Sequence, residues 1–170
     1  MKIKSLLMVA LLSMVFIAAT ENSYSQRIIK NYNEAITANP LAFAFGIFNV
    51  NYEMQVSRDN SVVLGAQYLG YQGWTGFGLS GTYKWYIFQE DEKAIKGFGF
   101  GPQASVLFLG YENDSYSNRM ALSIGGEASY KWILDDFVLE PVFGINYNVL
   151  SEKGLDWRPF YLGVNVGYAW

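Results

Sequence analysis

The sequence predicts an all-β fold, an eight-stranded antiparallel up-and-down β-barrel. Almost every segment after residue 40 alternates apolar residues with small or polar ones, a period of two that is typical of strands with two different faces. A Tyr-x-Trp motif recurs at the ends of three of these segments. Charged residues make up only 16% of the chain, whereas a soluble domain usually carries about 25%.

Six segments alternate clearly enough to be predicted as strands. The last is the clearest, because one of its faces carries only apolar and aromatic side chains while the other is mostly small or polar. The segment that begins at Met120 repeats this pattern. The six predicted strands cover residues 62–70, 75–88, 97–110, 120–134, 137–149 and 160–170.

The first strand region contains a phase shift. Its apolar residues are odd-numbered over 41–45 but even-numbered over 48–54. A β-bulge would produce such a shift. A two-residue hairpin turn at Gly46-Ile47 would also produce it, because glycine at the first central position suits a type II′ turn. We favour the hairpin, since it brings the strand count to eight and bacterial barrels have even strand numbers, with eight the smallest.

The N-terminal segment has the features of an export signal. Lys2 and Lys4 form a basic start, and an apolar run over residues 6–19 precedes small residues. This run is shorter than the roughly 20 apolar residues that a membrane-spanning helix needs. We predict cleavage before residue 26, with cleavage after residue 19 as the alternative. The predicted division of the chain is a signal peptide over residues 1–25, a lead segment over 26–36 and a barrel over 37–170.

Charge and cysteine content exclude several functional classes. The chain has a formal net charge of −3, which becomes −4 once Lys2, Lys4 and Glu21 leave with the signal. No basic stripe is present, so nucleic acid is not an expected partner. The chain contains no cysteine, so it offers neither a disulfide nor a cysteine-linked lipid anchor.

The Tyr-x-Trp motif bears on which face of the sheet points outward. It closes three alternate strands, which run in the same direction and therefore place their aromatic side chains at one level. Tyrosine and tryptophan collect at membrane–water interfaces, so one such level is typical of an interfacial girdle. The predicted membrane-interface girdle consists of Tyr83, Trp85, Tyr130, Trp132, Tyr168 and Trp170.

The opposite face of the strands consists mostly of Gly, Ala, Ser and Asn with a few charges. A water-exposed outer face would carry many Lys and Glu residues, whereas the inside of an eight-stranded barrel has room only for small groups and compact polar networks. We therefore predict a transmembrane barrel with lipid outside. The alternative is an exported soluble, lipocalin-like barrel that binds an apolar ligand inside, with Trp132 and Trp170 pointing inward.

The predicted links between strands agree only in part with this orientation. Periplasmic links would cover residues 57–60, 89–96 and 135–136, and external links residues 46–47, 71–74, 111–118 and 150–157. Outer-membrane barrels usually have much longer external loops. The external links here are barely longer than the periplasmic ones, which limits any function carried by loops.

A few charged residues face inward by the same alternation. A two-residue turn at Asp135-Asp136 would place Lys131 opposite Glu140. Because an unpaired charge in low dielectric is costly, we expect the inward charges to form one network. We interpret it as a plug that fills the lumen; a gate or a proton or ion path is the functional alternative. The predicted interior charge network is Glu53, Lys84, Glu127, Lys131 and Glu140.

Two sequence stretches and the final strand resemble small outer-membrane β-barrel proteins of the OmpA/OmpX-like type, and among these the largely uncharacterised barrel families. The stretches are Asn39-Pro40-Leu41 through Tyr52-Glu53, and Asp59-Asn60-Ser61-Val62. The resemblance covers about residues 39–170.

That resemblance implies location in the outer membrane of a Gram-negative bacterium, with outer-membrane lipids as partners, and implies little about activity. In such proteins a final strand ending in an aromatic residue resembles the signal read by the barrel-assembly machinery. The residues that match this pattern are Phe160, Leu162, Val164, Val166, Tyr168 and Trp170.

The sequence offers little for catalysis. It contains no histidine and no cysteine, so a Ser–His or Cys nucleophile and a His-based metal site are excluded. Carboxylates could still act as acid and base, but Glu127 and Glu140 belong more simply to the interior network. We predict no catalytic residue, cofactor or metal site, and expect a monomeric, non-enzymatic barrel with a structural or surface-interaction role. A carboxylate-based lipid-active enzyme would need Glu127 or Glu140 open to the lipid or to the external mouth.

Overall fold

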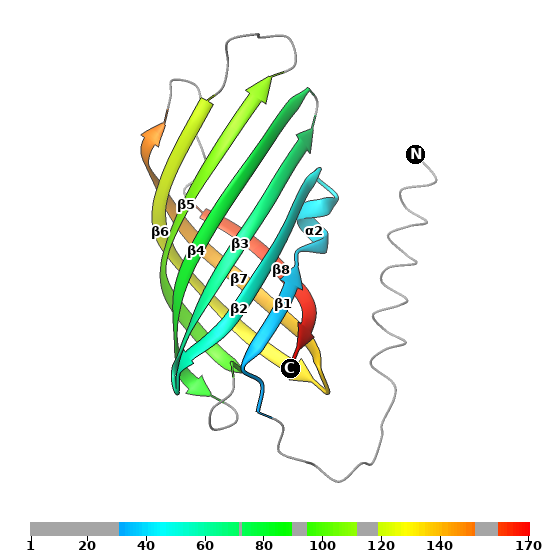
Figure 1. The fold of residues 1–170 in the computed structure, drawn as a ribbon, viewed down its shortest axis with the longest axis vertical. Helices are drawn as coiled ribbons and strands as arrows, with labels where there is room; N and C mark the ends of the chain where they lie inside the picture. Colours follow the sequence, from blue (N-terminus) through cyan, green and yellow to red (C-terminus); the bar gives the residue numbers. More distant parts are fainter. Residues whose placement is uncertain (1–30, 72, 90–94, 112–118, 152–159) are drawn as a thin grey trace, which may run out of the picture. The chain divides into compact units, whose positions relative to one another are not determined.

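The computed structural model describes residues 31–71, 73–89, 95–111, 119–151 and 160–170. Over these residues, eight strands form a closed barrel in which each strand pairs antiparallel with the next and β1 pairs with β8 (Figure 1). The prediction of an all-β, eight-stranded, antiparallel up-and-down barrel is confirmed. The predicted signal peptide, and most of the predicted links over 111–118 and 150–157, lie outside the described residues. No helix among the described residues is both long and apolar enough to cross a membrane.

The six strands predicted from residue 62 onward correspond to β3–β8, and their bounds agree to within two residues at each end. The turn at Asp135-Asp136 has two residues, as predicted, since Leu134 pairs with Phe137. The strands are β1 (Glu34–Ala38), β2 (Ile47–Ser57), β3 (Asn60–Tyr71), β4 (Trp74–Gln89), β5 (Gly97–Tyr111), β6 (Arg119–Leu134), β7 (Phe137–Ser151) and β8 (Phe160–Ala169).

The prediction of a hairpin at Gly46-Ile47 is wrong. The strand that precedes β2 and pairs with it is β1, with Ile36 opposite Tyr52 and Ala38 opposite Val50. The first strand therefore begins at Glu34, inside the segment that the sequence assigned to the lead. Its residues alternate correctly, but Ala35 and Thr37 face inward and only Ile36 is a large apolar residue, so the strand carries little hydrophobic signal.

Between β1 and β2 the chain forms a short helix, α2 (Pro40–Phe43), rather than strand. Asn39 is its N-cap, and its Oδ1 accepts hydrogen bonds from the backbone N–H groups of Leu41 and Ala42, both at 3.0 Å. Pro40 at the first helical position fits this start, because its fixed φ suits a helix and it has no N–H to leave unsatisfied. Gly46, at φ 75°, turns the chain into β2.

Two apolar clusters lie inside the barrel, one towards each end. The end with the turns at residues 58–59 and 135–136 is called the lower end, as drawn in Figure 1. The cluster there is partly built by Ile95, which follows β4 in the chain and whose N–H donates to the Tyr32 carbonyl oxygen at 3.1 Å. The lower cluster contains Ala35, Tyr86, Ile95, Ile133, Val138 and Ala169, with Tyr32 packed against it, and the upper cluster Leu107, Leu109 and Ala121, with Leu69.

Gly101 is required by a close approach between β4 and β5. Pairing between β4 and β5 is continuous down to Thr82–Gln103 and resumes at Trp85–Phe100. Pro102 lies in this interval and has no N–H to donate to the ladder. Beside it, a Cβ on Gly101 would overlap the carbonyl oxygen of Tyr83. The backbone itself, and not a movable side chain, therefore excludes any larger residue at position 101.

We predict that Gly101→Ala destabilises the barrel by about 1–3 kcal/mol, because two backbones would have to separate to admit the methyl group. Gly81→Ala is the matched control, since a Cβ at Gly81 meets no atom within 4 Å. Urea titration of both variants gives the free energy of unfolding. Equal effects of the two substitutions would contradict the close approach at Gly101.

Candidate functional site

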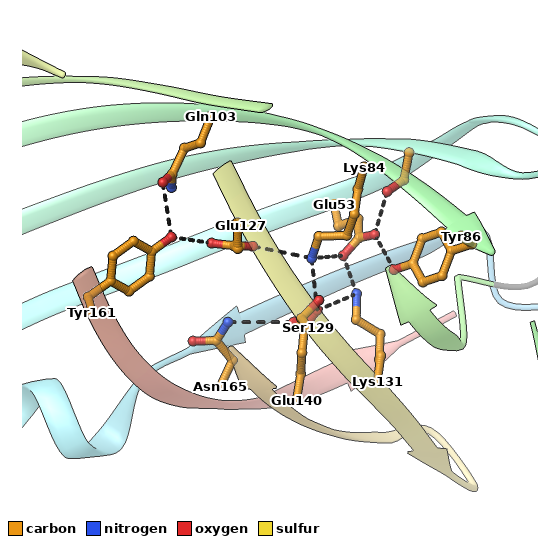
Figure 2. A network of polar contacts seen from close by, with 11 residues as sticks. Glu53, Lys84, Tyr86, Gln103, Glu127, Ser129, Lys131, Glu140, Tyr161 and Asn165 are labelled. Carbon is orange, nitrogen blue, oxygen red and sulfur yellow. Dashed lines mark hydrogen bonds and ion pairs between the residues drawn. The ribbon is translucent and has the colours of Figure 1, made fainter. Parts of the chain in front are cut away.

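The lumen contains the network that alternation predicted, and the structure brings all five predicted charged side chains into it. Figure 2 shows these side chains converging from opposite sides of the barrel. They come from β2, β4, β6 and β7, and each lies on the inward face of its strand because that face is set by the period of two. The network lies just above the lower apolar cluster, with which it shares Tyr86.

Glu53 is the acceptor through which β2, β3, β4 and β6 are connected. Its Oε1 accepts hydrogen bonds from the hydroxyl groups of Ser61 at 2.5 Å and Tyr86 at 2.6 Å. Its Oε2 accepts from the Lys131 ammonium group and lies 3.9 Å from that of Lys84. Both carboxylate oxygens are thus hydrogen-bonded, as a buried carboxylate requires.

Glu140 has a similar arrangement on the other side of the lumen. Its Oε1 accepts hydrogen bonds from Lys84 Nζ and from Ser129 Oγ, both at 2.8 Å, and lies 3.7 Å from Lys131 Nζ. Its Oε2 accepts from Asn165 Nδ2 at 3.5 Å. The predicted proximity of Lys131 and Glu140 follows from the register, because the pairs Trp132–Leu139 and Ser129–Val142 flank them.

Glu127 forms a looser upper branch of the network. Its Oε1 lies 3.5 Å from Lys84 Nζ, and its Oε2 accepts a hydrogen bond from the Tyr161 hydroxyl at 2.6 Å. The Tyr161 oxygen is also 2.9 Å from Oε1 of Gln103. The Glu127 side chain is 12% exposed, whereas those of Glu53 and Glu140 are 5% and 3% exposed. Glu127 is therefore the network carboxylate most open to the upper lumen.

Lys84 and Lys131 hold the network together, because each contacts at least two of the carboxylates. Their side chains are 1% and 0% exposed. Removing an ammonium group from water costs several kcal/mol, and only close, multiple ion pairs with hydrogen bonds offset that cost. The five charged side chains therefore connect β2, β4, β6 and β7 across the lumen, and we call this arrangement the cross-brace. The position of each of these strands depends on the charged side chains of the other three.

The prediction considered only the charged residues at inward positions, so it missed the uncharged members of the network. These residues lie at inward positions of the strands, so an inventory of inward hydroxyl and amide groups would have included them. Such an inventory could not say which of them bond to which carboxylate, because the partners are far apart in the sequence. The uncharged members are Ser61, Tyr86, Gln103, Ser129, Tyr161 and Asn165.

The aromatic residues of the predicted girdle lie on the outer face, near the lower end. Each Tyr-x-Trp motif packs its two rings together, with centroid separations of 5.3, 4.7 and 6.1 Å along the chain. Trp85 also packs against Phe100 at 5.7 Å, and Trp170 against Tyr52 at 6.5 Å. These contacts connect aromatic rings from different strands on the outer face.

A metal site would need several ligands placed together, and acid–base chemistry would need a carboxylate that its substrate can reach. Over the ranges that the structure describes, no group of three or more His, Cys, Asp or Glu residues is placed to hold a metal ion. Glu140 is 2% exposed and bonded to Lys84, so it faces neither lipid nor the upper mouth. Its carboxylate orients side chains within the lumen.

Comparison with protein-family models, with curated proteins and with solved structures finds no match. The resemblance to OmpA/OmpX-like barrels therefore stays a prediction, and the function has to be argued from the geometry of the barrel itself.

We predict that Lys84→Met destabilises the barrel by about 3–5 kcal/mol, because it leaves buried carboxylates without their shared cation. The control is Arg58→Met, a cation whose side chain is 62% exposed and whose ion pair with Asp59 is 4.0 Å long. Loss of such an exposed pair should change stability by at most about 1 kcal/mol. Urea unfolding followed by tryptophan fluorescence would compare the two, and similar losses would refute the cross-brace.

Proposed function

We propose that the protein is an integral outer-membrane β-barrel without enzymatic activity, and that its role is structural or one of surface interaction. In this proposal the lumen is closed by the charged network, the outer wall contacts lipid, and the lower end faces the periplasm. The lower ends of β4, β6 and β8, which lie at or next to Trp85, Trp132 and Trp170, are then at the periplasmic interface.

The observation that carries the proposal is that the barrel is apolar on its outer face and charged on its inner face, the reverse of a soluble protein. Large apolar side chains cover the outside of the barrel; Leu64, Ile145 and Leu162, for example, are 54%, 54% and 77% exposed. All charged residues within the described strands β2–β8 are at inward positions. Water would penalise so large an apolar surface, whereas lipid requires it, and outer-membrane barrels carry just such an apolar band.

The girdle supports the same orientation. Rings of Tyr83, Trp85, Trp132 and Trp170 are partly exposed on the outer face. Amphipathic rings at one level are favoured where the apolar band meets the headgroups. The aromatic pairs would then mark one border of the membrane.

The side chains inside the lumen favour a role other than that of an open pore through which solutes diffuse. Apolar clusters lie towards both ends, and the network fills the space between β2, β4, β6 and β7. An eight-stranded barrel has an interior just wide enough for its own side chains. The charged residues therefore serve as a plug, in preference to a gate or an ion path.

Two alternatives fit the geometry less well. A soluble barrel with an apolar ligand inside would need Trp132 and Trp170 to point inward, but they are 38% and 42% exposed on the outer face. A lipid-active enzyme would need a carboxylate open to its substrate, and Glu140 is buried against Lys84. Glu127, whose side chain is 12% exposed, is the network carboxylate most accessible to a substrate, and it is bonded to Tyr161.

The proposal includes two partners. Outer-membrane lipids would contact the wall, and the barrel-assembly machinery would read the final strand, whose outward residues are apolar or aromatic up to Trp170. We propose a monomer, because one chain closes the barrel by pairing β1 with β8.

Membrane fractionation and gel mobility test the proposal. The full chain, expressed with its signal in a Gram-negative host, is expected in the outer-membrane fraction. It should migrate differently in detergent before and after boiling, because a folded barrel resists detergent until it is heated. Recovery in the soluble periplasmic fraction without detergent would contradict the proposal and reverse the assignment of lipid to the outer face.

Two lysine substitutions on the outer face of β4 test whether this face is embedded in lipid. Leu79 and Ile87 are both outward and are 48% and 52% exposed, but only Leu79 lies well above the girdle. In lipid vesicles, Leu79→Lys should cost about 2–4 kcal/mol and Ile87→Lys about 0–1 kcal/mol, since a charge is penalised most at mid-membrane. Urea unfolding from vesicles measures both values. A water-exposed wall would tolerate the two substitutions equally.

A further inference from the structure

The barrel wall has one seam where a strand is replaced by the helix α2. β1 pairs with β8 only from Ala35–Ala169 to Ala38–Val166. Residues 160–165 of β8 and residues 47–49 of β2 extend above the last β1 pairs. The segment that contains α2 contacts both strands and covers this interval (Figure 1).

The segment over the seam is held more weakly than the strands. No residue of α2 is buried, and Leu41 and Phe43 are 50% and 56% exposed. A four-residue helix has little stability of its own. Its anchor is Asn39, whose N–H donates to Asn49 Oδ1 at 2.9 Å and whose amide group packs against Gly163 of β8.

A polar side chain lies on the lumen side of β8 beside the seam, with its ring over Gly144 of β7. Tyr161 belongs to the part of β8 that β1 does not cover, and its hydroxyl donates to Glu127 Oε2 at 2.6 Å inside the lumen. The outer side of the same region is apolar, with Leu162 77% exposed and Phe43 packed edge-on against Phe48 at 4.3 Å. The seam thus joins an apolar wall to a carboxylate.

The local charge balance favours a cation there. The network contains three carboxylates and two ammonium groups. Both lysines contact Glu53 and Glu140, whereas Glu127 lies 3.5 Å from Lys84 alone among the cations of the network. The other inward cation of the strands, Arg119, is over Trp74 at the top of β6, about 26 Å along the strand from Glu127 at 3.3 Å per residue.

We propose that the seam is a lateral binding site for a single-chain amphiphile with a cationic head. On displacement of α2, the ammonium group reaches Glu127 beside Tyr161, while the chain stays in the wall between α2 and β8 against Leu162 and Phe43. This inference rests on the proposed function, because the amphiphile enters from the membrane.

Photo-crosslinking tests the site. The probes are two dodecyl chains that carry the same diazirine, one ending in an amine and the other in a carboxylate, and labelled positions are mapped by mass spectrometry of the full-length protein in maltoside micelles. We expect the amine to label residues 39–48 and 160–165 about tenfold more than the carboxylate does, the effect of one charge-assisted contact. Equal labelling by the two probes, or labels spread around the wall, would overturn the proposal.

Variants separate the head-group site from mere exposure. Glu127→Gln should reduce labelling by the amine to the level of the carboxylate probe. Its matched control is Glu34→Gln, which removes a carboxylate bonded to Tyr52 outside the lumen and should leave labelling unchanged. Asn39→Ala should raise amine labelling several-fold, because it removes the cap that holds α2, and this variant tests the site even where Glu127→Gln fails to fold.

Two further readouts separate the ways in which the inference can fail. A heat-dependent mobility shift without selective amine labelling would overturn the lateral site and leave the proposed function standing. A protein that is soluble without detergent and shows no shift would remove the proposed function first. Crosslinked dimers through residues 160–165 would also overturn the site, since the occupant of the seam would then be a second copy of the chain.

Discussion

The structure depends on the ion pairs that Lys84 and Lys131 make inside the lumen. Two buried ammonium groups are tolerable only where several carboxylates surround them, and here those carboxylates come from three other strand positions around the barrel. The hydroxyl groups of Ser61, Tyr86 and Ser129 satisfy the remaining oxygens. Closure of the barrel and pairing of its interior charges therefore depend on each other, because the network forms only when distant strands are in register.

This interior has a consequence for the outer wall. Since the charged side chains of β2–β8 all point inward, the apolar residues on the alternate positions have no place except outside. In water that surface would favour aggregation, whereas in lipid it is the favourable one. The same period of two thus connects the buried network with the proposed membrane location.

The seam beside α2 departs from this regular design. Elsewhere in the described wall neighbouring strands pair with each other, with local register shifts, but above Ala38 a capped helix without buried side chains stands in for the first strand. In the proposed lateral site, this part of the wall is the route between lipid and lumen. Glu127 and Tyr161, which form the looser upper branch of the network, would lie at its inner end.

The sequence by itself determined the strand alternation, the two-residue turn at Asp135-Asp136 and the inward direction of the five charged residues. These features depend on local periodicity and on turn chemistry, which are legible along the chain. The count of eight strands was correct, but it was reached by taking residues 41–45 as a strand in place of Glu34–Ala38. Only the tertiary structure decided the first strand and the bonding partners. Glu34–Ala38 is too poor in apolar residues to be recognised, and Asn39-Pro40 starts a helix where alternation suggested a hairpin. The contacts of Glu127 with Tyr161, and of Glu53 with Tyr86, join residues 34 and 33 positions apart, because barrel closure, not sequence proximity, brings them together.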